Sequence, residues 1–170
     1  MKKRVLLLTT LAFASIAACA QSDQTITAVF SGMKFQVPET PVIVGTLGQS
    51  NNMLLIKYSQ SAGKRYISFS TEDSLDTGRC ERADFFMAVI GTEPANHCDE
   101  TAVTSFQNVF RNGSDSGVWN TDERDFYYFL SDDDRSFVFF SSNDGRLIKL
   151  ESDFLDAKDF QAALGIVEPH

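Results

Sequence analysis

The chain has 170 residues, with 23 Asp and Glu against 15 Lys and Arg and a formal net charge of −8. A chain this acidic is a poor ligand for phosphate backbones, which excludes nucleic acid as an expected partner. Apolar residues make up 43% of the chain and phenylalanine occurs 15 times, which is ample for one compact core and argues against disorder.

The N-terminal segment has the layout of a secretory signal peptide. A basic cluster at 2–4 precedes an almost wholly apolar run at 5–16. That run is too short to cross a bilayer, which takes roughly 20 residues. We therefore predict a signal peptide over 1–18. Its removal takes away three positive charges and leaves 12 basic residues against 23 acidic ones, a net charge near −11.

The end of this segment, Ile16-Ala17-Ala18-Cys19, resembles the lipobox of bacterial lipoproteins. In that class the signal is cut before the cysteine, which then carries acyl chains. The resemblance implies a lipidated Cys19, a short tether over 19–24, and a place in the cell envelope. Ala20, where inner-membrane retention would require Asp, implies the outer membrane, facing the periplasm. The alternative is an A-x-A site at Ala18-Cys19-Ala20, which would release a soluble protein from Gln21.

Residues 25–168 are expected to form a single domain that begins with strands. Alternating apolar and polar residues, separated by turn residues, predict two hairpins with a short strand between them. The expected strands are Thr25–Phe30, Met33–Val37, Val42–Leu47, Met53–Ser59 and Arg65–Thr71.

The middle of the domain changes to a helical period. A first helix is predicted over Arg79–Ile90, capped by Asp76-Thr77 and stopped by Gly91. A second is predicted over Asp99–Arg111, and a loop over 112–117.

Strands return in the last third, and a short helix follows them. The expected elements are strands Arg124–Leu130, Ser136–Ser142 and Arg146–Glu151, then a helix over Asp156–Leu164 ended by Gly165. Short turns between neighbouring strands require antiparallel pairing. The predicted fold is α+β: a mainly antiparallel sheet with two or three helices packed on one face.

Two cysteines remain in the domain, Cys80 and Cys98. An even pair in an oxidising compartment predicts a disulfide, and closing this loop contributes about 3 kcal/mol in the chain-entropy model. Both cysteines lie near predicted helix starts, which an antiparallel helix pair would place at opposite ends. A zinc site that includes His97 lacks paired ligand spacing, so we expect no metal and no cofactor.

Catalytic motifs are missing from the sequence. There is no G-x-S-x-G, no P-loop and no G-x-G-x-x-G. The acidic runs at 122–125 and 132–134 lack the spacing of a calcium loop. We therefore expect a non-catalytic binding or interaction domain.

Consecutive aromatic residues at 126–129 face both sides of a strand, so either both faces are covered or one aromatic row is exposed. An exposed row would be a binding surface, and its expected members are Trp119, Tyr127 and Tyr128. Two partners are expected. The lipid would bind a membrane, and the acidic domain would attract a basic protein. An immunity or inhibitor protein that neutralises a basic periplasmic toxin or enzyme, and an envelope assembly factor, are the alternatives.

The stretch Ser31-Gly32-Met33-Lys34-Phe35-Gln36-Val37-Pro38, behind a lipoprotein-type signal, resembles the start of DcrB and PsbP-like envelope lipoproteins. The resemblance implies a small α/β sandwich. It carries no functional residues, since that family offers no catalytic motif to match.

Overall fold

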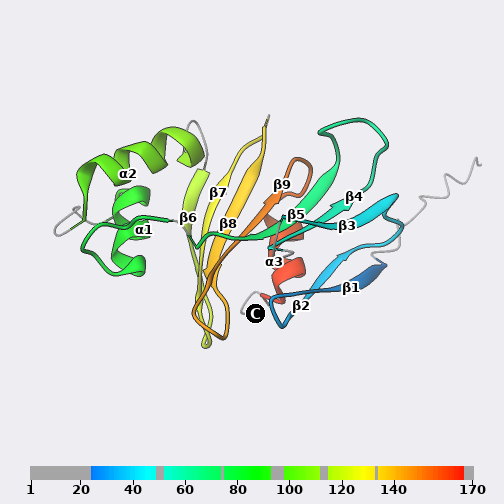
Figure 1. The fold of residues 1–170 in the computed structure, drawn as a ribbon, viewed down its shortest axis with the longest axis horizontal. Coiled ribbons are helices and arrows are strands. Elements are labelled where there is room, and N and C mark those ends of the chain that lie inside the picture. The colour runs from blue at the N-terminus through cyan, green and yellow to red at the C-terminus, as the bar shows by residue number, and fades with distance from the viewer. Residues whose placement is uncertain are drawn as a thin grey trace, which may run out of the picture.

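The computed structural model describes residues 24–48, 52–73, 75–92, 98–111, 115–132 and 134–166. They form one α+β domain with a seven-stranded antiparallel sheet and a separate two-stranded hairpin (Figure 1). The strands are β1 (Thr25–Phe30), β2 (Met33–Pro38), β3 (Ile43–Leu47), β4 (Met53–Lys57), β5 (Tyr66–Thr71), β6 (Asp115–Asn120), β7 (Asp125–Leu130), β8 (Ser136–Ser141) and β9 (Leu147–Ser152). The helices are α1 (Arg82–Ile90), α2 (Glu100–Phe106), which continues into a π-helical turn η1 (Gln107–Arg111), and α3 (Ala157–Leu164).

The large sheet has the strand order β3-β4-β5-β9-β8-β7-β6. β9, the last strand in the chain, lies between β5 and β8. It therefore joins the strands that precede α1 and α2 to the strands that follow them. β3 and β6 are therefore the two edges of the sheet, about six strand spacings or roughly 29 Å apart.

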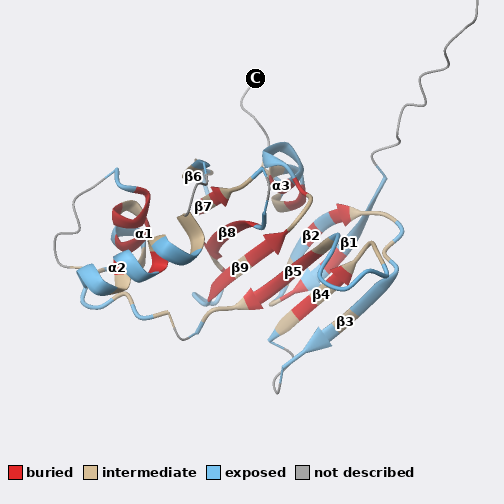
Figure 2. Ribbon diagram, turned by 90° about the horizontal axis from the view of Figure 1, so that it is seen from above, coloured by how far each residue is buried: buried red, intermediate tan, exposed pale blue. Residues whose placement is uncertain are grey.

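Both faces of the sheet carry a hydrophobic core. On β8, Val138 and Phe140 pack toward the β1–β2 hairpin and α3, whereas Phe137 and Phe139 pack toward α1 and α2. This alternation follows from the two-residue period of a strand. All five residues from 136 to 140 are buried, so a cover on one face alone would leave an aromatic row in water (Figure 2).

The predicted α+β class and the antiparallel sheet are confirmed. The placement of the helices on one face holds for α1 and α2, while α3 packs on the opposite face beside the hairpin. The reason is that Phe160 of α3 is fully buried against the face that already presents Val138 and Phe140. None of the described helices is long and apolar enough to cross a membrane.

The helix ends follow the capping residues closely, with one exception. Asp99 accepts from the amides of Thr101 and Ala102 at the start of α2, and Asp156 accepts from the amide of Asp159 at the start of α3. The exception is α1, which begins at Arg82 instead of 79. Asp76 there accepts from the Gly78 amide at 2.8 Å and stabilises a turn before the helix.

The edge strand β6 occupies positions where the sequence predicted a loop over 112–117. Its residues include Asp, Gly and Asn, which are depleted in strands. β6 forms because β7 offers a full partner edge, pairing from Asp115↔Leu130 to Asn120↔Asp125. Tertiary pairing therefore overrides a weak local preference.

Candidate functional site

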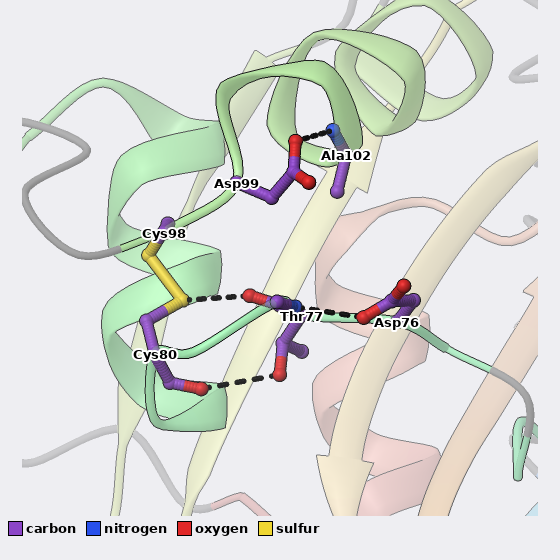
Figure 3. Close-up of a disulfide and its surroundings, with 7 residues drawn as sticks. Asp76, Thr77, Cys80, Cys98, Asp99 and Ala102 are labelled. Carbon is purple, nitrogen blue, oxygen red and sulfur yellow. Dashed lines mark hydrogen bonds between the residues drawn. A yellow bond between two sulfur atoms is a disulfide. The ribbon is translucent and has the colours of Figure 1, made fainter.

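The structure brings the two predicted disulfide cysteines together. The Sγ atoms of Cys80 and Cys98 lie within bonding distance and their Cα atoms are 4.7 Å apart (Figure 3). Gly78 and Cys98 form an isolated antiparallel bridge, and the Thr77 hydroxyl donates to the Cys80 carbonyl at 3.1 Å. The 3.1 Å approach of the Cys80 sulfur to the Thr77 carbonyl is a contact only, since a disulfide sulfur carries no hydrogen.

This pair ties the starts of α1 and α2, and a second contact ties their ends. The Val89 carbonyl near the end of α1 accepts from Gln107 Nε2 at 2.9 Å and from Arg111 at 3.0 Å. A cation at a helix C-terminus also complements the helix dipole. Contacts at both ends exclude an antiparallel arrangement of the two helices. The expected conflict between a disulfide and an antiparallel pair does not arise, because the helices are not antiparallel.

The three aromatic residues expected to share a surface lie on two different faces. Tyr127 is only 7% exposed and stacks on Phe86 of α1, with ring centroids 4.5 Å apart. Burial, reinforced by the nearby Asp125, raises the pKa of Tyr127 to about 12. Tyr127 is thus a core residue under α1, and its assignment to a binding surface is corrected.

Trp119 and Tyr128 do lie together, on the α3 side of the sheet. Their rings stack with centroids 4.5 Å apart and an interplanar angle of 23°, and both are half-buried. Gly117 lies directly opposite Tyr128 across the strand pair. A Cβ at position 117 would lie 2.5 Å from the Tyr128 hydroxyl oxygen, so the missing side chain makes room for this ring.

An acidic pocket of about 470 Å³ opens at the start of α3. Its wall comes from the ends of β6, β7 and β9 and from the β7–β8 turn, and it contains no basic side chain. Five aspartates line it: Asp115, Asp132, Asp134, Asp153 and Asp156. Like charges gathered around one cavity create a negative potential that favours a cationic group.

Two of these carboxylates are held rigidly by the fold. Asp153 accepts from the backbone amides of Arg65 and Tyr66 at 2.8 and 2.9 Å. Asp156 caps α3. The other three, Asp115, Asp132 and Asp134, are exposed. Asp134 also forms an exposed ion pair with Arg135, 3.9 Å from its Nε. The pocket therefore combines fixed acidic groups with exposed acidic groups that can turn toward a ligand.

A second, wider pocket of about 820 Å³ lies at the opposite end of α3, between the β1–β2 turn and the β6–β7 turn. Its charges are mixed, since Lys34 and Arg124 accompany Asp122 and Glu123. Arg124 is anchored there by the Ser141 carbonyl at 2.9 Å and by Asn143 at 2.8 Å. We call the area from the acidic pocket to this second pocket, with the Trp119–Tyr128 stack between them, the α3–β6 surface.

The other polar cluster of note lies on the α1–α2 face and centres on Glu151. Its carboxylate accepts from the Tyr66 hydroxyl and forms ion pairs with Arg135 at 3.3 Å and Lys149 at 3.6 Å. Burial, and then the bond to Glu151, raises the pKa of Tyr66 far above its usual range. A carboxylate with three donors on or next to β5, β8 and β9 is well suited to hold these strands together.

Two residues weighed from the sequence, Cys19 and His97, lie outside the described residues. Within the described ranges no three His, Cys, Asp or Glu side chains are grouped to hold a metal ion.

The acidic pocket was not predicted from the sequence, although the run of acidic residues at 132–134 was visible there. Its partners at 115, 153 and 156 are distant in the chain, and only pairing of β6, β7, β8 and β9 brings them to one rim.

Comparison of the chain with protein-family models and with curated protein sequences found no match.

Proposed function

We propose that this protein is a lipid-anchored envelope protein whose single domain binds a basic protein partner at the α3–β6 surface. The observation that carries the proposal is the pocket of about 470 Å³ lined by five aspartates and no basic residue. A lysine or arginine side chain of a partner would enter it and be surrounded by carboxylates. The anchor rests on the lipobox-type sequence that ends at Cys19.

The aromatic stack supports the same surface. Trp119 and Tyr128 offer flat, half-buried rings next to acidic groups. Tryptophan, tyrosine and arginine are enriched at protein interfaces, and arginine stacks on aromatic faces. Because Asp153 and Asp156 are already fixed by backbone amides, part of the acidic site is ordered before a partner arrives, which lowers the cost of binding.

The test uses Trp119, the single tryptophan of the chain, as the reporter. The mature protein is titrated with a lysine- and arginine-rich peptide, and with a glutamate-rich peptide of equal length. We expect the basic peptide alone to change Trp119 fluorescence. Combined Asp132→Asn and Asp134→Asn substitutions should weaken that binding about tenfold, since each exposed ion pair contributes up to about 1 kcal/mol.

The matched control combines Asp84→Asn with Glu100→Gln, which neutralise two exposed acidic residues on α1 and α2, outside the α3–β6 surface. It should change the affinity less than twofold. Equal weakening by both sets of substitutions would show a response to net charge alone, and the assignment to the acidic pocket would then be abandoned.

The anchor has a separate test. Replacing Cys19 by Ser should abolish metabolic labelling with palmitate, because the acylated sulfur is lost. Label that persists in the Cys19→Ser protein would refute the anchor and leave the binding proposal standing.

An immunity or inhibitor protein is the second candidate, since an acidic pocket is what a blocker of a basic enzyme or toxin would present. A toxin gene directly beside this one would favour it. If the protein is an envelope assembly factor, membrane-embedded partners should co-purify with it from solubilised membranes. Loss of those partners in the protein with both Asp132→Asn and Asp134→Asn would show that they bind at the acidic pocket.

A further inference from the structure

Exposed apolar side chains gather at one side of the domain. Among the described residues, seven large hydrophobic side chains are exposed, and six of them precede residue 48. Four of the six, which we call the β3 edge, are Val42, Ile43, Val44 and Leu47, and each is 49–58% exposed. Figure 2 shows β3 exposed along most of its length at the rim of the sheet. Such a concentration marks an interaction surface.

The outer side of this edge is open in the part of the chain that the structure describes, where β3 pairs only with β4. Edge strands are usually protected by charged side chains, proline or bulges. Here no charged residue occurs from Thr40 to Ile56, in a chain with 23 acidic residues. Apolar side chains are exposed on both faces of β3. The edge is therefore suited to contact an apolar surface that approaches the sheet from the outer side of β3.

The charge of the surroundings differs sharply from that of the rest of the protein. Residues 24–71 contain four basic side chains and one acidic one, whereas residues 72–170 contain eight basic and 21 acidic ones. Three of the four cluster where β3 begins: Lys57 lies opposite Ile43, and Lys64 and Arg65 follow in the β4–β5 turn. The acidic pocket begins at Asp153, which accepts from the Arg65 amide, and extends away from there to β6, six strand spacings or roughly 29 Å from β3.

The chain enters the domain beside this same edge. The Gln24 carbonyl accepts from the Glu39 amide at 3.0 Å, only three residues before Val42. Residues 20–24 can span at most about 18 Å when fully extended. If Cys19 carries the lipid, as the proposed function holds, Gln24 is kept within that distance of the membrane, and the start of β3 lies only three residues beyond the Glu39 that Gln24 binds.

We propose that the β3 edge is the membrane-facing surface of this protein and docks into the interfacial layer of a bilayer that contains anionic lipids. The inference rests on the proposed lipid anchor. The apolar side chains enter the boundary between head groups and acyl chains, and Lys57, Lys64 and Arg65 meet the head groups. The outward backbone groups of β3 stay at the level of head groups and water, where they find partners.

This orientation gives the two ends of the sheet different tasks. The β3 edge faces the lipid, and the α3–β6 surface faces away from it, toward a partner. The strongly acidic part of the domain is then held off the anionic membrane, which would repel it.

The test measures contact with lipid at single positions in the acylated, full mature protein. Trp119 is replaced by Phe, which retains an aromatic ring against Tyr128. A new tryptophan is then placed at Val44 on β3 or, as the matched control, at Val109. Val109 is 64% exposed and is the one exposed large hydrophobic of the described residues that lies outside the first strands. Both proteins are reconstituted into phosphatidylethanolamine–phosphatidylglycerol vesicles with and without brominated acyl chains.

We expect brominated lipid to reduce the fluorescence of the Val44→Trp protein at least twofold and to leave the Val109→Trp protein unchanged. A third protein with Leu47→Trp should behave like Val44→Trp, and circular dichroism confirms that each is folded. Vesicle-bound protein without quenching at 44 and 47, as when a second copy of the protein covers β3, would overturn the inference and leave the anchor intact. Equal quenching at 44 and 109 would also overturn it. Protein that does not float with the vesicles would refute the anchor, and the inference with it.

Discussion

At the scale of single residues, Gly117 controls the geometry of the proposed partner surface. The Tyr128 ring occupies the space that a side chain at 117 would fill, and in that position it stacks on Trp119. The contact involves the outer end of the Tyr128 ring, which can rotate away without moving the backbone. Position 117 therefore allows the stack to be disturbed without destroying the sheet.

We predict that Gly117→Val displaces Tyr128 from Trp119 and weakens binding of the basic peptide. The near-ultraviolet circular dichroism of the stacked rings should fall, while the far-ultraviolet spectrum stays the same. Gly45→Val on β3 is the control, because a Cβ there meets nothing within 4 Å. An unchanged near-ultraviolet spectrum in the Gly117→Val protein would contradict this role for the glycine.

At the scale of elements, α1 and α2 form a pair that is fastened at both ends. Cys80 and Cys98 connect the segments before the helices, and Gln107 and Arg111 bind the Val89 carbonyl where α1 ends. The pair covers the β7–β8 aromatic rows through Phe86 and Phe106, which are buried. The disulfide thus secures the cover over one of the two cores.

Replacing both cysteines by serine should lower the free energy of unfolding by about 3 kcal/mol, because the unfolded chain gains the entropy of an open loop. Urea denaturation with and without reductant provides the measurement. Reduced wild-type protein should match the Cys80→Ser, Cys98→Ser protein, which should not respond to reductant. If reductant left the wild-type midpoint unchanged, the disulfide would not be part of the stable fold.

At the scale of the whole molecule, tyrosines in separate parts of the fold share one electrostatic property. Burial raises the pKa of Tyr58 and of Tyr127 to about 12, and burial together with Glu151 raises that of Tyr66 further. Each prefers its neutral form in the folded state more strongly than in the unfolded state, where the pKa is near 10. Their contribution to stability is complete below pH 10 and is lost as the pH rises toward 12.

We therefore predict an alkaline loss of stability that begins near pH 10, measured by urea denaturation between pH 8 and 12. Absorbance at 295 nm should show these tyrosines ionising together with unfolding. Tyr127→Phe should reduce the loss, because phenylalanine keeps the stack on Phe86 and has no proton to release. Tyrosines that ionised near pH 10 in protein that is still folded would contradict the burial argument.

Local patterns predicted much of the fold. The hairpin β1–β2, the strands β7 to β9 and the helix α3 follow from alternating apolar residues and from caps such as Asp156 and Gly165. These signals depend on neighbours one to four positions apart, so they are readable in the chain itself. The pairing of Cys80 with Cys98 was predictable for a different reason, since only two cysteines remain in the domain.

The amino-acid sequence by itself determined the class of the fold, the start of α2, both ends of α3, the cysteine pair and the acidity of the protein. Only the tertiary structure decided that β6 is a strand, that α3 lies opposite α1 and α2, and that Tyr127 is core while Tyr128 is surface. Burial and cavities depend on which element covers which face, and that is set by contacts between residues far apart in the chain. The acidic pocket belongs to this second group, because its aspartates at 115, 132, 134, 153 and 156 meet only after the strands have paired.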